Sequence, residues 1–124
     1  MPNVRAEHPG NGSPASAISD LVVRLVSDYT GRGPTKARAY LGDELVAVVL
    51  EDTLTKGERS LVRDGQRERV LDTRKAYQMT MRAEMISGIE QITGRSVRAF
   101  MSDNHIEPDV AVELFLLEPD GGAR

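Results

Sequence analysis

The chain has 124 residues with no cysteine, and its 19 acidic and 16 basic residues give a formal net charge of −3. This length suits one domain with a modest core, the lack of cysteine excludes disulfides and thiol chemistry, and the negative charge argues against a nucleic-acid partner. The longest apolar run, Leu45–Leu50, covers six residues, far fewer than the roughly 20 that span a bilayer.

The two ends of the chain differ in composition from its middle. Residues 1–14 are rich in Gly, Pro and Asn, and residues 120–124 resemble them, so both ends are predicted to be disordered. A single domain is expected over residues 15–119. No basic segment followed by an apolar one opens the chain, so we expect a cytoplasmic protein without a membrane span, peripheral to a membrane only through a partner.

The first predicted elements are a helix and a hairpin. The helix begins near Ser16 and ends at Gly31, which is a typical residue at a helix C-terminus. Its apolar residues recur at the spacing of one helical face and are Ile18, Leu21, Val22, Leu25, Val26 and Tyr29. The hairpin has strands over residues 36–42 and 45–51, joined by a tight turn.

The second half of the chain predicts two helices and another hairpin. Thr55–Glu58 has the capping-box pattern that opens a short helix, and a longer helix is expected over residues 68–93. The main apolar stripe of the longer helix consists of Val70, Leu71, Tyr77, Met81, Met85, Ile89 and Ile92. The second hairpin pairs residues 96–102 with residues 109–117.

The sequence contains two similar units. Thr30-Gly31-Arg32 leads into Arg38, and Thr93-Gly94-Arg95 leads into Arg98. Each unit has the pattern of a helix followed by two strands, and so small a unit cannot bury its apolar face alone. We therefore predict an α+β fold in which a tandem-duplicated helix-strand-strand unit gives a four-stranded antiparallel sheet with helices packed on one face.

Both faces of this sheet are predicted to be apolar. We assign one face to the helices, and its residues are Val46, Val48, Leu50, Val110, Val112, Leu114 and Leu116. The opposite face is expected to carry Tyr40, Phe100 and Phe115, while Met79 and Ile86 turn away from the main stripe of the long helix. Monomers rarely expose so much apolar surface, so we predict that these five residues form an interface in a homodimer or with an obligate partner.

The most distinctive local sequence is a basic, glycine-rich segment between the first helix and its hairpin. Its candidate anion- or partner-binding residues are Arg32, Gly33, Pro34, Thr35, Lys36 and Arg38. Backbone N–H groups and cations in such a loop could bind a phosphate, a carboxylate or bicarbonate. The alternative is a simple helix-to-strand connection whose cations lie near the negative end of the helix dipole.

Arg74 lies within the apolar stripe of the long helix, where it must reach solvent or pair with an acid. We predict a buried, structural ion pair between Arg74 and Asp103, with Asp43, Glu51 and Asp52 as alternative partners.

Asp103-Asn104-His105 lies in the longer second loop, with Glu107 and Asp109 nearby. These groups could bind a hard divalent cation or act as acid and base, or they could simply form an exposed turn. No serine has the setting of an activated nucleophile. We expect no catalytic residue, no metal and no cofactor, and hence no enzyme.

The segment Tyr29–Arg38 resembles the signature of the MpsC-like family, named for the C subunit of a sodium-translocating, membrane-potential-generating system and formerly a domain of unknown function. Further elements of the resemblance are Leu54-Thr55, Arg74, Thr93-Gly94-Arg95 and Ser102-Asp103. The resemblance spans about residues 18–118. It implies a protein that works beside membrane subunits which move cations or inorganic carbon, and it supplies no catalytic residues.

These observations lead to two main hypotheses. The first is a non-enzymatic cytoplasmic accessory or regulatory protein of a membrane cation or inorganic-carbon transport system, which dimerises and docks onto a transport subunit. The second is a module that binds an anion, a nucleotide or RNA through the basic segment, with Tyr40 and Phe100 as stacking platforms. A third, weaker hypothesis is an enzyme that uses Asp103 and His105.

Overall fold

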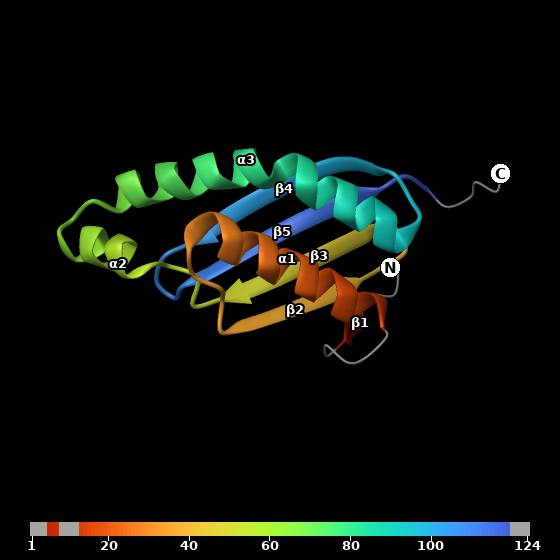
Figure 1. The fold of residues 1–124 in the computed structure, drawn as a ribbon, viewed down its shortest axis with the longest axis horizontal. Helices are drawn as coiled ribbons and strands as arrows, with labels where there is room; N and C mark the ends of the chain where they lie inside the picture. The colour runs from red at the N-terminus through yellow and green to blue at the C-terminus, as the bar shows by residue number, and fades with distance from the viewer. Residues whose placement is uncertain (1–4, 8–12, 120–124) are drawn as a thin grey trace.

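The protein is described here from a computed structural model, which covers residues 5–7 and 13–119 (Figure 1). Within these residues the strands form one antiparallel sheet in the order β1-β2-β3-β5-β4. Its four long strands are β2 (Lys36–Leu41), β3 (Leu45–Glu51), β4 (Val97–His105) and β5 (Val110–Leu117). The three-residue strand β1 (Arg5–Glu7) adds to the edge at β2.

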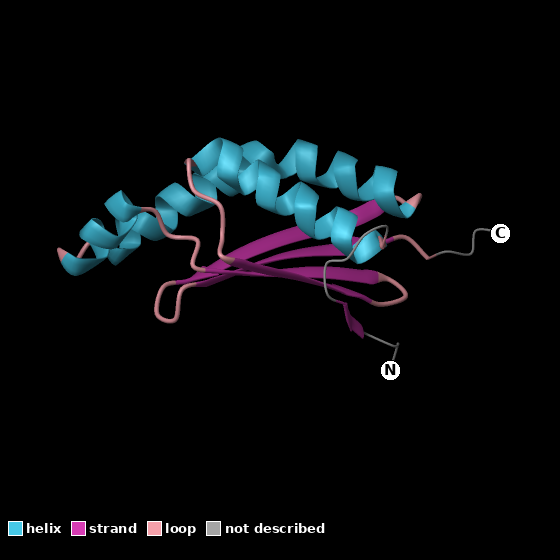
Figure 2. Cartoon of the chain, turned by 60° about the horizontal axis from the view of Figure 1, so that its bottom comes forward, coloured by secondary structure: helices cyan, strands magenta, loops and turns pink. Residues whose placement is uncertain are grey.

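The helices of the described residues lie on one side of this sheet, and no described element covers the other side, called the bare side below (Figure 2). Helix α1 (Pro14–Thr30) and helix α3 (Arg67–Thr93) run side by side across the sheet, and α2 (Lys56–Arg63) packs beside the first turns of α3. The predicted α+β fold with helices on one face is confirmed. Its two helix-strand-strand units are α1-β2-β3 and α3-β4-β5, and their origin by duplication stays a prediction.

The two Thr-Gly-Arg sequences end α1 and α3 with the same geometry. Gly31 and Gly94 follow their helices in the left-handed conformation, at φ of 83° and 71°, which glycine adopts without strain. In each cap the threonine hydroxyl donates to a carbonyl four residues earlier and accepts from the arginine N–H two residues later. The local sequence therefore determines both helix ends.

The predicted disordered ends fall largely outside the described residues, because residues 1–4, 8–12 and 120–124 are not described. Arg5–Glu7 pair with β2 as a strand, which the sequence did not predict. Helix α1 begins at Pro14 rather than near Ser16, because the Ser13 hydroxyl caps it by accepting from the Ser16 N–H at 2.9 Å. Among the described residues, no helix combines the length and apolar character that a membrane crossing requires.

The main core lies between the sheet and the α1–α3 pair. Its buried side chains include Ile18, Val22, Val46, Val48, Leu50, Met85, Ile89 and Phe115. The two helices approach closely where a side chain on Gly88 would collide with Leu21, since an added Cβ would lie 2.4 Å from Leu21 Cδ2. A larger residue at position 88 would therefore force the Leu21 side chain to shift.

The predicted face of β5 is wrong. Ala111, Glu113, Phe115 and Leu117 are buried against the helices, whereas Val110, Val112, Leu114 and Leu116 point to the bare side. Pairing with β3 sets this arrangement, because Val46 lies opposite Phe115 and Val48 opposite Glu113. Residues directly opposite in a sheet share a face, so the buried Val46 and Val48 bring the odd-numbered residues of β5 inward.

Candidate functional site

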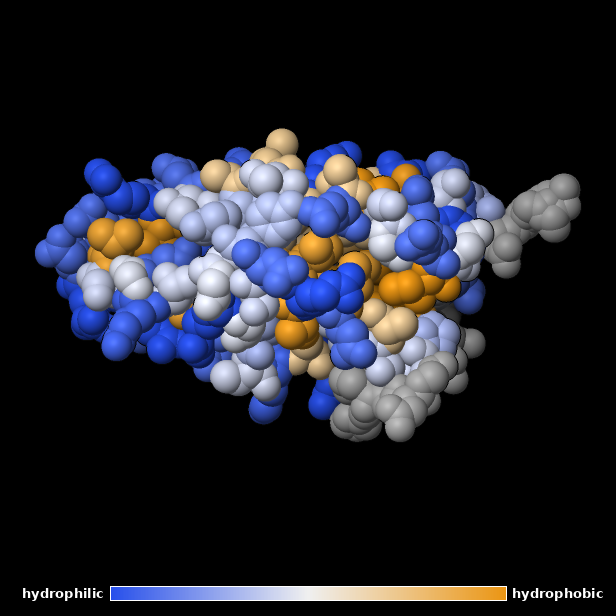
Figure 3. All heavy atoms as spheres, in the orientation of Figure 1, coloured by the Kyte–Doolittle hydropathy of each residue, from blue (hydrophilic) through white to orange (hydrophobic). Residues whose placement is uncertain are grey.

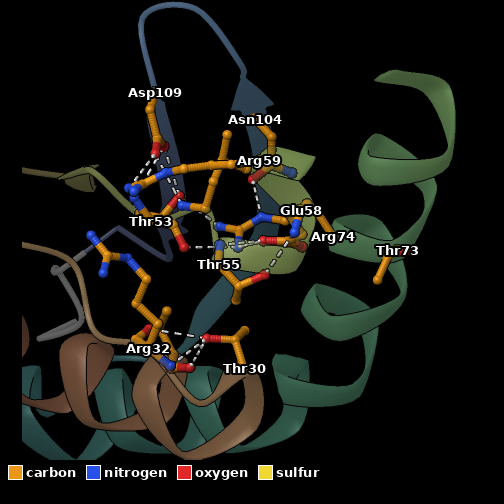
Figure 4. Close-up of polar contacts among 12 residues, drawn as sticks. Thr30, Arg32, Thr53, Thr55, Glu58, Arg59, Thr73, Arg74, Asn104 and Asp109 are labelled. Atoms are coloured by element: carbon orange, nitrogen blue, oxygen red, sulfur yellow. Dashed lines mark hydrogen bonds and ion pairs between the residues drawn. The ribbon is translucent and has the colours of Figure 1, made fainter. Parts of the chain in front are cut away.

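Arg74 is the centre of a buried polar network at the end of the sheet near α2 (Figure 4). Its guanidinium donates to the Thr53 hydroxyl at 2.8 Å and to the Thr53 carbonyl at 3.3 Å. It also lies 3.3 Å from Glu58 Oε1. The predicted burial and ion pairing of Arg74 are confirmed, but the predicted partner is wrong, since Asp103 lies exposed on the bare side of the sheet.

Glu58 and Asp109 attach α2 to the rest of the molecule. Glu58 closes the predicted capping box, because its carboxylate accepts from the Thr55 N–H at 2.8 Å and its N–H donates to the Thr55 hydroxyl at 3.1 Å. Asp109, in the β4–β5 turn, accepts from the N–H groups of Thr53 and Leu54, both at 3.0 Å. These bonds fix the β3–α2 connection against the turn.

An inner branch of the network runs from Arg74 to Glu113. Asn104 Oδ1 accepts from Arg74 Nε at 3.4 Å and from Gln78 Nε2 at 3.2 Å. Beyond them, the Ser102 hydroxyl donates to Glu113, which is 1% exposed. Burial raises the pKa of Glu113 to about 7, against the opposing effects of the Ser102 hydrogen bond, the Arg74 charge and Gln78.

An outer branch lies on the surface around Asp52, which is held at a positive φ of 61°. Arg32 NH2 lies 2.6 Å from Asp52 Oδ2, and Arg59 also pairs with Asp52. Burial raises the pKa of Asp52, but the hydrogen bond and charge of Arg32, the charge of Arg59 and the Thr35 hydroxyl together hold it below its usual range. The branch ties the start of the basic segment to the end of β3.

The basic segment is therefore divided between two surroundings. Arg32 is engaged with Asp52, and Gly33 and Pro34 form the connection that leads to Thr35, whose N–H donates to the Glu51 carbonyl at 3.1 Å. Lys36 and Arg38 instead lie on the bare side of the sheet, where they line a hollow with Tyr40, Val49 and Glu51. Anion binding by this segment stays a prediction, carried by Lys36 and Arg38 rather than by Arg32.

The bare side of the sheet, called the open face below, is apolar across its middle. Its half-exposed or exposed residues include Lys36, Arg38, Tyr40, Leu45, Ala47, Val49, Glu51, Ala99, Met101, Asp103, His105, Val110, Val112, Leu114 and Leu116. The prediction that Phe100 and Phe115 lie on this face is wrong. Their rings pack 5.0 Å apart on the helix side, because β4 and β5 pair Phe100 directly with the fully buried Phe115.

Of the predicted apolar interface, Tyr40 lies on the open face, and Met79 and Ile86 lie on α3 across the sheet from it. Met79 is 65% exposed. An interface role for these residues stays a prediction.

The acidic and histidine side chains of the second loop are not gathered into one site. Asp103 and His105 lie on the open face, and His105 Nδ1 is 2.8 Å from the Pro108 carbonyl, whereas Asp109 turns toward Thr53. Among the described residues, no group of three or more His, Asp or Glu side chains is arranged to hold a metal ion. The network instead joins α2, α3 and the β4–β5 turn mechanically.

Sequence reasoning missed three acidic members of the network, namely Glu58, Asp109 and Glu113. Glu58 had a signal, because an acid within a capping box lies beside the helix N-terminus, where other polar groups converge. Asp109 and Glu113 had none, since their burial depends on how β5 pairs with β3 and β4.

Comparison with known proteins gives one family. The family whose description reads Na⁺-translocating membrane potential-generating system (MpsC) matches residues 11–119. No curated protein and no solved structure matches the chain.

Proposed function

Because the chain belongs to the MpsC family of the Na⁺-translocating membrane potential-generating system, we propose that it is a non-enzymatic accessory protein of a membrane cation or inorganic-carbon transport system. It acts by association, both with a second copy of itself and with a transport subunit. The observation that carries this proposal is the open face, a sheet surface with an apolar middle that no described part of the chain covers. A surface of this kind is typical of a protein–protein interface.

The polar residues support a role in association rather than in catalysis. Arg74 and Glu58 pair with each other, Asp109 bonds to the connection that leads into α2, and together they hold α2 in place. The side of the molecule that bears the helices is mostly hydrophilic, with apolar atoms in small patches (Figure 3). Met79 on α3 remains accessible there when the open face is occupied, and it is our candidate contact for a transport subunit.

The proposal is tested by affinity purification of the tagged chain from detergent-solubilised cells of its host, read by quantitative mass spectrometry. We expect enrichment of a polytopic cation or inorganic-carbon transport subunit, lost in Met79→Glu. Gln91→Glu adds the same charge at another exposed position on α3 and should retain the subunit. Recovery of the bait alone, or of RNA-associated proteins, contradicts the proposal.

One observation favours the second candidate, a module that binds an anion, a nucleotide or RNA. Lys36, Arg38 and Tyr40 line one hollow on the open face, which combines cations with an aromatic ring. Binding of a fluorescent single-stranded RNA or nucleotide should then weaken steeply with salt and disappear in Lys36→Ala/Arg38→Ala. Binding at low salt that the double variant retains would contradict this candidate. Arg32→Ala is less suitable, because it removes the Asp52 ion pair as well.

A further inference from the structure

We propose that two copies of this chain associate face to face through the open face, with a twofold axis along the strands, so that Arg38 of each copy meets Asp103 of the other. The inference rests on the self-association proposed above and specifies its geometry. It follows from the order of residues across the sheet, from the charges on the outer long strands β2 and β4, and from the symmetry of a dimer.

The strand register places opposite charges at the two ends of one row on the open face. Arg38 lies opposite Val49 on β3, Val49 lies opposite Val112 on β5, and Val112 lies opposite Asp103 on β4. The row therefore runs from a cation through two valines to an acid. Its charges are separated by the two central strands.

The neighbouring row of the open face is apolar throughout. Tyr40 lies opposite Ala47, Ala47 opposite Leu114, and Leu114 opposite Met101, which is 49% exposed. The two rows together form an apolar centre with one basic and one acidic edge. An apolar centre with charges at its rim is the usual composition of a protein interface.

The two edge charges have no ion-pair partner among the residues that the structure describes. Neither Arg38 nor Asp103 takes part in the ion pairs of this region, which join Arg32 and Arg59 to Asp52 and Arg74 to Glu58. The Asp103 carboxylate accepts a local bond from the Asn104 N–H at 2.9 Å. Both side chains thus keep their charge available to a second molecule.

Symmetry selects how the second copy lies. A twofold dimer presents the same patch on both copies, and two stacked sheets keep their strands within about 30° of each other. A twofold axis parallel to the strands reverses the order of the strands in the second copy. Strand β2 then lies over β4 of the second copy, and each row of residues faces the same row of the other copy. Arg38 then faces Asp103 of the second copy, twice, while the valines of the row meet in the centre.

The other axis in the plane of the interface runs across the strands and is disfavoured by charge. It lays β2 over β2 of the second copy, which brings the Lys36 and Arg38 edges of both copies together. Like charges placed against each other across an interface cost affinity and suppress that arrangement.

The available area is sufficient for a weak dimer. Four strands with the spacing and length of these would bury on the order of 1,000 Å² in total when two copies stack, which is near the lower limit of specific interfaces. We therefore expect reversible dimerisation with a dissociation constant in the micromolar range.

The experiment uses charge reversal and mixing. Arg38→Asp and Asp103→Arg are prepared separately and together, and association is measured by sedimentation equilibrium over micromolar to hundreds of micromolar protein. Each single variant places like charges at both contacts and should dimerise roughly tenfold or more weakly than the unmodified chain. An equal mixture of the two single variants should form heterodimers of near-normal affinity, because each heterodimer contains two opposite-charge pairs. The double variant should dimerise like the unmodified chain.

The controls separate folding, association and geometry. Circular dichroism melting checks that each variant folds, and Arg24→Asp applies the same charge change on exposed α1, where it should leave association unchanged. An unmodified chain that stays monomeric throughout overturns self-association, whatever the transport-subunit purification shows. Two outcomes would overturn the axis along the strands while leaving self-association intact. In the first, both single charge reversals dimerise as strongly as the unmodified chain. In the second, Arg38→Asp pairs with the unmodified chain in preference to Asp103→Arg.

Discussion

Neighbouring residues of β5 lie in two different surroundings. Ala111, Glu113, Phe115 and Leu117 are buried beneath the helices, whereas Val112 and Leu114 lie half-exposed on the open face. The buried side contains a carboxylate, and the exposed side contains valine and leucine. Apolar character alone therefore does not identify the inner face of this sheet. The inner face is covered by helices of the same chain, whereas no described element covers the open face, where we propose that a second molecule binds.

The largest expected difference in stability is between alanine substitutions at two adjacent residues of β5. Phe115→Ala should lower the free energy of unfolding by about 3–5 kcal/mol, because it leaves a cavity among fully buried side chains. Leu114→Ala should change the stability of the monomer by less than about 1 kcal/mol, as is usual for surface sites, and should weaken dimerisation instead. Urea unfolding at low protein concentration measures the first effect and sedimentation the second. Equal losses of monomer stability would show that the two faces do not differ as described.

A second substitution tests the polar part of the inner face. Arg74→Ala should cost about 3 kcal/mol of unfolding free energy, because Glu58 then stays buried without its cation. This loss of unfolding free energy is at the low end of what is usual when one partner of a buried ion pair is removed, because the Thr55 N–H still donates to Glu58. Lys75→Ala alters an exposed neighbour on α3 and should stay within about 0.5 kcal/mol. A loss in Arg74→Ala no larger than in Lys75→Ala would mean that the network does not hold α2.

The fold was predictable where local sequence decides it. The capping box at Thr55 and Glu58 and the glycines at positions 31 and 94 indicate helix ends through bonds made within a few residues. The inner face of β5 was not predictable in this way, because apolar residues occupy both sides of the strand. Pairing with β3, about 65 residues earlier, decides which side is buried.

The site was predictable only in part, for a related reason. The position of Arg74 within an apolar helical stripe indicated its burial and its need for an acid. Its partner comes from α2, which folds back along the start of α3, and nothing local to Arg74 indicates that arrangement. Strand β4 also continues to His105, beyond the predicted end at residue 102, and this extension carries Asp103 onto the open face and away from Arg74.

The smallest expected effect concerns Glu113 and the response of stability to pH. Its pKa is raised from an ordinary value of 4.5 to about 7 in the folded protein, so the folded state binds a proton more tightly than the unfolded state does. The stabilisation from this group is complete below about pH 4.5 and is lost progressively as the pH rises to about 7. The total loss has an upper limit of about 3 kcal/mol.

Glu113→Gln keeps the shape of the side chain and removes its titration, so the variant should lose this decline of unfolding free energy between pH 5 and 7. Asp52 has the opposite effect, because its pKa is lowered in the folded protein. Its contribution to the free energy of unfolding is lost as the pH falls through its folded-state pKa. Urea unfolding of the unmodified chain and the variant between pH 5 and 7 isolates Glu113, because the lowered pKa of Asp52 puts its titration below its ordinary 3.8. A decline that persists unchanged in Glu113→Gln would assign the pH dependence to other residues, and the buried carboxylate would then be ionised at neutral pH beside Arg74.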